Sequence, residues 1–278
     1  MITNAQALAT AQVLGLDRLD AQLLLLHALG KPDNERAWLL AHDGDALCEK
    51  EQAAFAGFSQ RRAAGEPLAY ILGYKEFFGL RLHVNADVLI PRADTETLVQ
   101  WALDVLSPVA KPQALDLGTG SGAVAVALAH SLKTRVTATD LSQKALAVAL
   151  QNARQLEVNV QFVHSNWLEK VSGHYHAIVS NPPYIANNDP HLAALVHEPV
   201  SALTAGKHGL DDIEKIVKDA PQHLHPGGWL LLEHGYDQAN AVCQLLVQNG
   251  FTQVQSRLDL AGIVRCSGGR WDNQHIDF

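Results

Sequence analysis

The tetrapeptide Asn181-Pro182-Pro183-Tyr184 contains the residue types that point most directly to chemistry. Proline has no N–H, so this stretch can present the carboxamide oxygen of Asn181 and the backbone carbonyl of Pro182 as two acceptors. When both protons of a planar nitrogen are accepted, its lone pair is drawn out of conjugation, and Tyr184 can stack on the planar group. We therefore predict a site that activates an amide or aromatic amine nitrogen, with Asn181, Pro182 and Tyr184 as catalytic residues. A rigid Pro-Pro turn with a surface tyrosine is the alternative that the four residues alone leave open.

A glycine-rich stretch, Asp116-Leu117-Gly118-Thr119-Gly120-Ser121-Gly122, lies between an expected strand and an apolar helix at 123–129. Glycines permit a tight turn and the close approach of a ligand to the backbone beside a helix N-terminus. Asp140 ends the next expected strand, where a carboxylate can accept both hydroxyls of a ribose. A nicotinamide dinucleotide fits the same spacing, and a purely structural turn is a further alternative. Asp116 favours a cationic sulfonium over a pyrophosphate dianion, so we predict S-adenosylmethionine as the cofactor.

These residues must be positioned by the elements around them. From about residue 114 onward, short apolar runs alternate with helical segments, which predicts a parallel sheet with helices on both faces. In such sheets, ligands bind at the carboxyl ends of the strands, where both motifs fall. The expected strands are 114–117, 135–139, 160–164, 176–180 and 229–233, followed by a final pair at 252–258 and 262–267.

The first part of the chain has a different pattern. Residues 1–72 contain helical segments with apolar residues such as Leu19, Leu23 and Leu26 on one face, which predicts a small helical bundle. Alternating apolar residues from Tyr74 to Ile90 predict a β-hairpin. We therefore expect a helical domain at 1–72, a hairpin linker at 73–92 and a catalytic domain at 93–278.

Composition narrows the class of protein. The chain has 278 residues and a formal net charge of -8, which argues against a general affinity for nucleic acid. Three widely spaced cysteines and the absence of a signal or membrane-spanning stretch predict a soluble cytoplasmic protein.

Two histidine pairs and one acidic residue are further functional candidates. The first pair is His174 and His176, the second His223 and His225, and neither is accompanied by a carboxylate or thiol cluster, so we predict no metal site. Glu233 ends the strand at 229–233. A structural role is expected for it, because the reaction needs no strong base.

The tetrapeptide resembles the catalytic motif of class I amino-methyltransferases that act on adenine, cytosine or glutamine nitrogens. Residues 65–73 and 76–79 resemble the linker of the HemK/PrmC family, and Pro91-Arg92-Ala93-Asp94-Thr95-Glu96 is similar to that family's Pro-Arg-Pro-Asp-Thr-Glu signature. The resemblance implies a Rossmann-like class I fold with a seven-stranded, mostly parallel sheet. It also implies methylation of the glutamine in the Gly-Gly-Gln motif of peptide chain release factors, with S-adenosylhomocysteine as the cofactor product.

The residues and the resemblance together assign cofactor contacts to Asp116, Gly118, Thr119, Gly120, Ser121, Gly122, Asp140, Asn166, Trp167 and Asn181. They assign substrate contacts to Asn181, Pro182, Pro183, Tyr184, Glu198, Phe77 and Arg92. Core packing is an equal alternative for Phe77. Two positions depart from the family pattern, because Ala93 replaces a proline and Asn166 stands where the family often has aspartate. An asparagine can still accept a hydrogen bond from the adenine amine through its amide oxygen.

Other functions remain open from the sequence. The tetrapeptide also suits a nucleic-acid adenine methyltransferase, and glutamine methylation of a ribosomal protein differs mainly in the N-terminal linker. A non-enzymatic, cofactor-binding scaffold is a third possibility. We expect release factors as the partners, no stable nucleic-acid or membrane partner, and a monomer.

Overall fold

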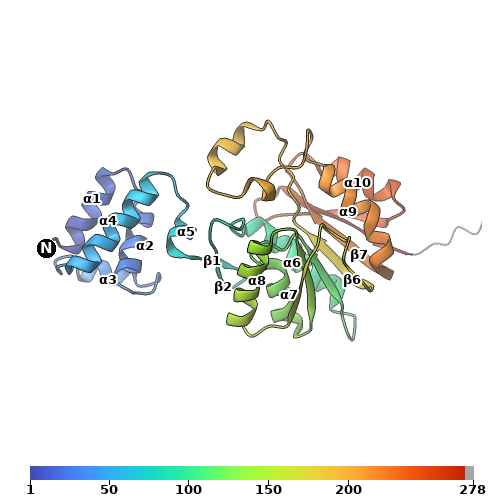
Figure 1. Ribbon diagram of the computed structural model, residues 1–278, viewed down its shortest axis with the longest axis horizontal. Helices are drawn as coiled ribbons and strands as arrows, with labels where there is room; N and C mark the ends of the chain where they lie inside the picture. Colours follow the sequence, from blue (N-terminus) through green and yellow to red (C-terminus); the bar gives the residue numbers. More distant parts are fainter. Residues whose placement is uncertain (273–278) are drawn as a thin grey trace, which may run out of the picture. The chain divides into compact units, whose positions relative to one another are not determined.

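The computed structural model describes residues 1–272, so residues 273–278 of the expected catalytic domain lie outside the described part. The chain divides into two compact units, Met1–Tyr74 and the part that begins at Lys75 (Figure 1). Within the described residues, no helix combines the length and apolar character needed to cross a membrane.

The first unit is a helical bundle, as the apolar pattern predicts. Its helices are α1 (Asn4–Val13), α2 (Arg18–Ala28), α3 (Arg36–Ala41), α4 (Glu49–Ala63) and α5 (Leu68–Leu72). The buried faces of these helices meet around Leu24, Leu25, Leu39 and Phe55. Thr3 caps α1 through a reciprocal pair of hydrogen bonds with Gln6, which satisfies two backbone donors at the helix start.

A short hairpin, β1 (Tyr74–Phe77) and β2 (Leu80–His83), follows. Its turn residues Phe78 and Gly79 both have positive φ, at 51° and 71°, as a two-residue hairpin turn requires. The backbone N–H of Phe78 donates to Glu96 Oε1 at 2.9 Å. Glu96 is the first residue of α6, so this bond ties the turn to the start of that helix.

The second unit is built on a seven-stranded sheet with strand order β5-β4-β3-β6-β7-β9-β8. Five neighbouring strands are parallel, whereas β9 runs antiparallel to both β7 and β8. The strands are β3 (Ala114–Leu117), β4 (Val136–Asp140), β5 (Val160–His164), β6 (Tyr175–Ser180), β7 (Leu224–Glu233), β8 (Thr252–Leu258) and β9 (Val264–Trp271). The seven-stranded, mostly parallel sheet that the resemblance implies is therefore confirmed.

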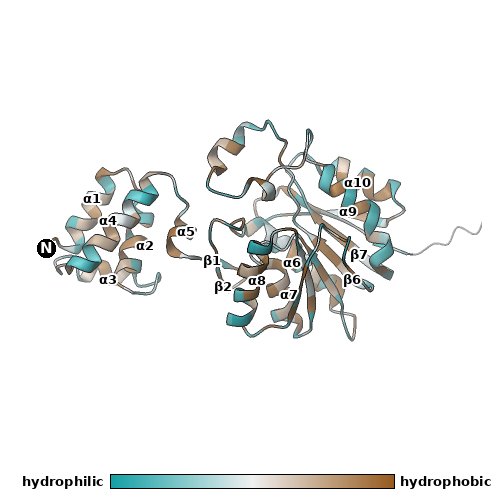
Figure 2. Ribbon diagram, viewed as in Figure 1, coloured by the Kyte–Doolittle hydropathy of each residue, from teal (hydrophilic) through white to brown (hydrophobic). Residues whose placement is uncertain are grey.

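Helices cover both faces of this sheet (Figure 1). One face packs against α6 (Glu96–Leu106), α7 (Ala123–Leu132) and α8 (Gln143–Gln155), and the other against α9 (Asp211–Asp219) and α10 (Ala239–Gln248). Successive strand residues point to opposite faces, so Ala177 and Val179 join the first core and Ile178 the second. Because both faces of the sheet are buried, the central strands consist of nearly continuous apolar residues, which Figure 2 shows in brown.

The strand order reverses beside β3. The chain passes outward through β4 and β5 and then returns to the other side of β3 as β6. Loops that leave β3 and β6 in opposite directions separate at this point, which opens a crevice at the carboxyl ends of the strands. Two short 3-10 helices also border this edge, η1 (Ala93–Thr95) and η3 (Val200–Ala202). Two others, η2 (Pro190–Leu195) and η4 (Ala220–His223), precede η3 and β7 in the chain.

Candidate active site

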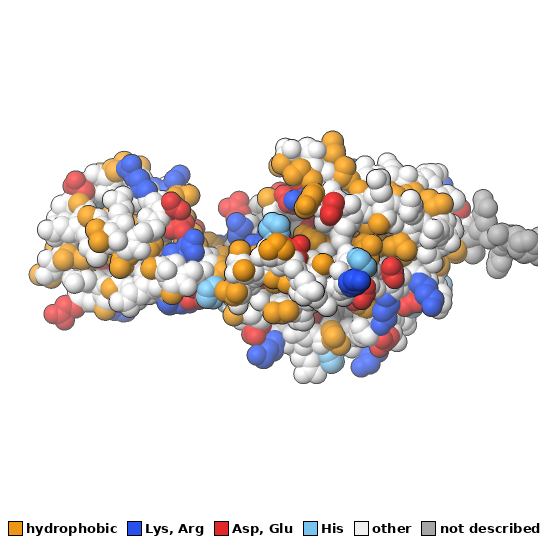
Figure 3. Space-filling model, turned by 90° about the horizontal axis from the view of Figure 1, so that it is seen from above, with side chains coloured by type: hydrophobic (Ala, Val, Ile, Leu, Met, Phe, Trp, Pro, Cys, Tyr) orange, Lys and Arg blue, Asp and Glu red, His pale blue; other side chains and the backbone are white. Residues whose placement is uncertain are grey.

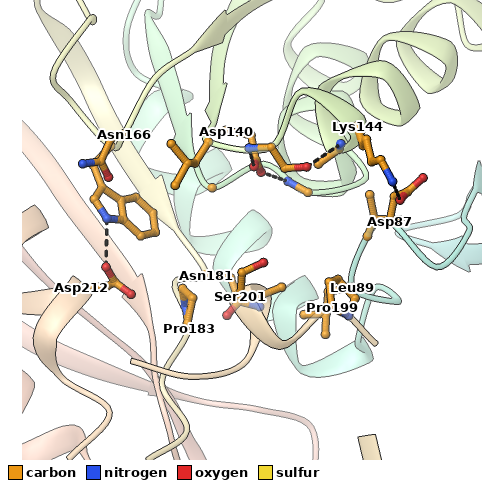
Figure 4. A pocket seen from close by; sticks show the side chains of 18 of the residues that line it. Asp87, Leu89, Asp140, Lys144, Asn166, Asn181, Pro183, Pro199, Ser201 and Asp212 are labelled. Carbon is orange, nitrogen blue, oxygen red and sulfur yellow. Dashed lines mark hydrogen bonds and ion pairs between the residues drawn. The ribbon is translucent and has the colours of Figure 1, made fainter. Parts of the chain in front are cut away.

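A cavity of about 530 Å³ lies at this edge, and all of its lining residues belong to the second unit (Figure 4). The loops after β3, β4, β5 and β6 each contribute to it, as does the segment that follows the hairpin. The lining residues are Ala86–Leu89, Gly118, Gly120, Asp140–Ser142, Lys144, Ala145, Ser165–Trp167, Asn181, Pro183, Pro199, Ser201, Ala202 and Asp212. The volume is in the range of small-molecule and cofactor sites.

The glycine loop forms one wall, and its glycines have two different tasks. Gly118 has a φ of +69°, and a Cβ placed there would lie 3.0 Å from the ring of Trp167. Gly122 has a φ of +83°, and a Cβ there would lie 3.0 Å from the side chain of Ala149 on α8. Gly118 therefore makes room for a tryptophan at the cavity, whereas Gly122 permits close packing of α7 and α8.

Asp140 lies at the end of β4 and lines the cavity. Its Oδ2 accepts from the Gly120 N–H and its Oδ1 from the Ser142 N–H, both at 2.8 Å. Burial raises the pKa of Asp140, and these backbone donors oppose the rise. Each carboxylate oxygen has a second lone-pair direction, so the fixed carboxylate can still accept two hydroxyl groups.

Asn166 and Trp167 follow β5 and form the opposite end of the cavity wall. The Trp167 indole N–H donates to Asp212 Oδ1 at 3.0 Å, which fixes the ring plane beside Gly118 (Figure 4). The Asn166 Nδ2 donates to Glu169 Oε1 at 2.5 Å. Because this bond uses the amide nitrogen, the amide oxygen of Asn166 is the atom left for a ligand. No signal in the sequence pointed to Asp212, which tertiary packing brings to this wall.

Asp116 supports the glycine loop from within the fold. It is buried in β3, and its Oδ2 accepts from the Thr119 hydroxyl at 2.6 Å and from the Ala125 N–H at 3.1 Å. Burial raises the pKa of Asp116 to about 7. Asp116, Thr119, Ser121 and Gly122 are not among the residues that line the cavity. Direct contact of these four with a cofactor stays a prediction.

The loop 181–184 borders the same cavity through Asn181 and Pro183, and Figure 4 shows both across from Asp140. Asn181 Nδ2 donates to the hydroxyl of Thr95 at 3.1 Å. Within the described chain, neither the Asn181 Oδ1 nor the Pro182 carbonyl accepts a hydrogen bond. Pro182 itself is buried and is not among the lining residues, so its contact with a substrate stays a prediction. Thr95 lies inside the signature at 91–96, although its link to Asn181 is visible only in the tertiary structure.

Tyr184 does not line the cavity, and its backbone is fixed by neighbouring residues. Its carbonyl accepts from Gln238 Nε2 at 3.0 Å. A Cβ on Gly209 would lie 2.1 Å from that carbonyl, so only glycine fits there. Burial raises the pKa of the Tyr184 phenol, which therefore stays neutral. Stacking of Tyr184 on a substrate stays a prediction.

Arg92 and Glu198 contact one another. The guanidinium of Arg92 pairs with Glu198 Oε1, while Oε2 of the same carboxylate accepts from the Ile90 N–H at 3.1 Å. Glu198 is buried, with both oxygens engaged inside the protein. This pair joins the segment after the hairpin to the segment that carries Pro199 and η3, both at the cavity rim. A direct contact of either residue with a substrate stays a prediction.

For Phe77 the expectation of a substrate contact is wrong. The side chain is only 1% exposed and packs in the core with Leu82, Leu98 and Trp101. A strand residue that points into the sheet-helix core cannot reach a substrate, so the core alternative holds.

The histidine-rich region lies away from this cavity. His176 and His225 have ring centroids 4.4 Å apart, and His174 lies 5.7 Å from His225. Among residues 1–272, no group of three or more His, Cys, Asp or Glu side chains has a geometry that could hold a metal ion.

Comparisons with known proteins agree with this geometry. A family model for the methyltransferase small domain matches residues 94–256, and one for the PrmC N-terminal domain matches residues 3–73. The release factor glutamine methyltransferase of Bordetella pertussis is 50% identical over 260 residues, which cover 92% of this chain and 95% of the relative. The corresponding protein of Coxiella burnetii is 48% identical, covering 89% and 90%.

Among solved structures, the T. thermophilus 16S rRNA N2 G1207 methyltransferase in complex with AdoMet and guanosine aligns with a TM-score of 0.54 at 19% identity. The alignment covers 71% of this chain and 49% of that one, and it supports the fold alone. Fold and cavity thus define a methyltransferase of the class I type. More narrowly, the chain belongs to the release factor glutamine methyltransferase family.

Proposed function

We propose that this chain transfers a methyl group from S-adenosylmethionine to the side-chain amide nitrogen of the glutamine in the Gly-Gly-Gln motif of peptide chain release factors. One observation carries the proposal within the structure. Asn181 lines the cavity, with its amide nitrogen bound to Thr95 and its Oδ1 unused. The carbonyl of Pro182, the next residue in the chain, is also unused among the described residues. These are the two acceptors that a primary amide requires. Membership of the family supports glutamine as the group that bears this amide.

The cavity residues suit the cofactor that the family uses. The spare lone pairs of Asp140 fit a ribose diol, and the amide oxygen of Asn166 fits the exocyclic amine of adenine. The Trp167 ring offers a flat apolar wall. When bound, S-adenosylmethionine supplies a methyl group on a cationic sulfur.

The residues of the loop 181–184 then act on the substrate amide. An amide nitrogen is a poor nucleophile because its lone pair is delocalised. Asn181 Oδ1 and the Pro182 carbonyl accept hydrogen bonds from its two N–H groups. This turns the nitrogen lone pair toward the methyl donor and sets the distance and alignment between nitrogen and methyl group. No strong base is needed at this stage, since the methylated amide nitrogen is acidic until it releases its proton.

Transfer of label tests the proposal. Purified release factor and a Gln→Ala variant of its Gly-Gly-Gln motif are incubated with the protein and methyl-labelled S-adenosylmethionine. Label should enter only the unmodified release factor. Asn181→Ala should lower the rate by roughly 10²-fold while cofactor affinity falls only modestly, because one oriented acceptor is lost.

Other labelling patterns would contradict the proposal. Label in RNA or DNA but not in release factor would favour a nucleic-acid adenine methyltransferase. Label in a ribosomal protein would favour glutamine methylation of that protein. The net charge of -8 and the mixture of acidic, basic and apolar side chains on the face drawn in Figure 3 support a protein substrate. Unchanged biological activity of Asn181→Ala would indicate a scaffold.

We further propose that the protein acts as a monomer without a stable nucleic-acid partner, with residues 1–72 as the substrate-recognition domain, 73–92 as the linker and 93–278 as the catalytic domain. The cavity supports the assignment of catalysis to the second unit, because all of its lining residues lie there. Sedimentation at working concentration would show a single species near 30.1 kDa.

A further inference from the structure

Glu233 is a buried acidic residue that the reaction outlined above does not use. It ends β7 and is 1% exposed. Its Oε2 has no hydrogen-bond partner in the described part of the chain. A buried carboxyl with a spare acceptor costs stability unless nearby donors offset the loss of water. Its surroundings therefore need a physical account.

The sheet register places Glu233 beside the acceptor loop. Ser180 at the end of β6 pairs with Leu232 of β7, so the next residues, Asn181 and Glu233, are neighbours across two parallel strands. The side chains of Thr95 and Asn181 lie beside the Glu233 carboxylate, and their polarity lowers its pKa. Asn181 Nδ2 also donates to the Thr95 hydroxyl at 3.1 Å. Three polar side chains from distant parts of the sequence thus meet behind the cavity.

This arrangement distinguishes the two orientations of the Asn181 amide. With Nδ2 bound to Thr95 beside the Glu233 carboxylate, the amide N–H groups lie near acceptors and Oδ1 is the atom left for the cavity. In the flipped orientation, Oδ1 would face a carboxylate that can only accept, which is electrostatically unfavourable. The Thr95 hydroxyl accepts from Asn181 and can donate a hydrogen bond of its own to Glu233.

We propose that Glu233 is a positioning residue. Together with Thr95 it accepts hydrogen bonds from the amide N–H groups of Asn181 and so holds Oδ1 toward the substrate. The inference rests on the proposed function, because it concerns the acceptor for the substrate amide. Glu233 touches neither cofactor nor substrate and acts through Asn181.

The charge of Glu233 decides whether this arrangement holds. Burial raises the pKa of Glu233 to about 7, and Asp94 adds to the rise, whereas Thr95, Arg265 and Asn181 oppose it. The Tyr184 phenol and the Cys266 thiol also feel its charge, and burial keeps both of these groups neutral. Once protonated, Glu233 can donate to Oδ1 of a flipped Asn181. The rate of methyl transfer should therefore fall as the pH drops through about 7.

Four variants test this in the full-length protein. Thr95→Val removes the hydroxyl at constant shape, Thr95→Ser restores it, and Glu233→Gln removes the charge. Thr139→Val is the matched control, because Thr139 is also a buried threonine and its hydroxyl has no partner among the described residues. With release factor and cofactor saturating, kcat should fall about tenfold in Thr95→Val and Glu233→Gln, with an unchanged KM for S-adenosylmethionine. Thr95→Ser and Thr139→Val should stay within about twofold of wild type.

The pH profile adds a readout that a merely structural role would not move. The acid limb of kcat near pH 7 should be present in wild type and Thr139→Val and absent in Glu233→Gln. Equal kcat values for wild type and Thr95→Val, or an acid limb that persists in Glu233→Gln, would overturn the proposal. If Glu233→Gln proves unfolded by thermal denaturation, the Thr95→Val and Thr95→Ser pair decides.

Nuclear magnetic resonance separates this inference from the proposed function. The side-chain amide signals of Asn181, assigned by their loss in Asn181→Asp, should shift with pH in wild type but not in Glu233→Gln. An amide that ignores pH in both proteins contradicts the positioning role. Failure of the wild type to methylate release factor would instead refute the proposed function while leaving this titration intact.

Discussion

Single residues in this site are best understood from which of their polar atoms are already used. Asn181 has its nitrogen committed to Thr95 and its oxygen unused. Glu198 has both carboxylate oxygens engaged by Arg92 and Ile90. Both are polar and both lie near the cavity, yet only the first has an acceptor to offer a substrate. The arrangement of donors, more than residue type, separates binding groups from supporting ones.

Asp116→Asn is expected to change how stability depends on pH. Burial raises the pKa of Asp116 from 3.8 to about 7, so the folded protein retains a proton that the unfolded chain releases. A raised pKa gives a stabilisation that is complete below 3.8 and is lost as the pH rises through about 7. The free energy of unfolding of wild type should fall relative to the variant by roughly 1 kcal/mol per pH unit in that window, and level off above it.

Urea unfolding from about pH 5 to about pH 8 measures this difference. Asp104→Asn is a suitable control, because Arg257 lowers the pKa of Asp104, so its contribution changes only at lower pH. A difference between wild type and Asp116→Asn that stays constant across the window would contradict the assigned burial effect.

At the scale of elements, the site depends on loops held in register by their neighbours. The glycine loop is fixed by Asp140 from β4 and by Asp116 from β3. Trp167 has a φ of +51° and occupies the space that Gly118 leaves. The loop after β3 and the loop after β5 are therefore one packed unit, although they are separated in the sequence.

Gly118→Ala should weaken cofactor binding about tenfold, because the new Cβ meets the Trp167 ring at 3.0 Å and the ring must move. The left-handed backbone at a φ of +69° adds a stability cost of about 1–2 kcal/mol. Gly262→Ala is the matched control, with a φ of +80° and no atom within 4 Å of the Cβ. It should cost similar stability and leave cofactor affinity unchanged. Calorimetric titration with S-adenosylmethionine measures the cofactor affinity of the two variants. Equal affinities would count against the role of Gly118.

The whole molecule consists of two units with separate cores. The cores of the helical bundle and of the sheet share no residues, and all cavity residues belong to the second unit. A glutamine side chain alone offers little to recognise, so selection of a protein substrate needs surface beyond the cavity. We assign that task to the first unit.

Removal of residues 1–74 should therefore separate cofactor binding from substrate choice. The truncated chain is expected to bind S-adenosylmethionine within about twofold of wild type, while methylation of intact release factor falls by roughly 10²-fold, because the added binding surface is lost. Calorimetry measures the first quantity and label transfer the second. Undiminished methylation by the truncated chain would contradict the recognition role.

Much of this architecture was predictable from local pattern. Continuous apolar runs such as residues 177–179 indicate strands buried on both faces, and the glycine loop and the loop 181–184 lie at strand ends as expected. Phe77 was assigned wrongly to a substrate contact, because an aromatic strand residue reads the same whether it faces a core or a ligand. The hairpin strands end at His83, before the expected limit near Ile90, because no partner strand continues the pairing beyond that point.

The sequence by itself determined the chemistry of the loop 181–184: two prolines remove donors and leave acceptors, whatever the fold around them. It also determined the class of fold, because apolar periodicity and glycine spacing are local properties. Only the tertiary structure decided which acceptors remain unused. Hydrogen bonds from Asn181 to Thr95 and from Trp167 to Asp212 join residues far apart in the chain. Such contacts arise from strand order and packing, and no local pattern encodes them.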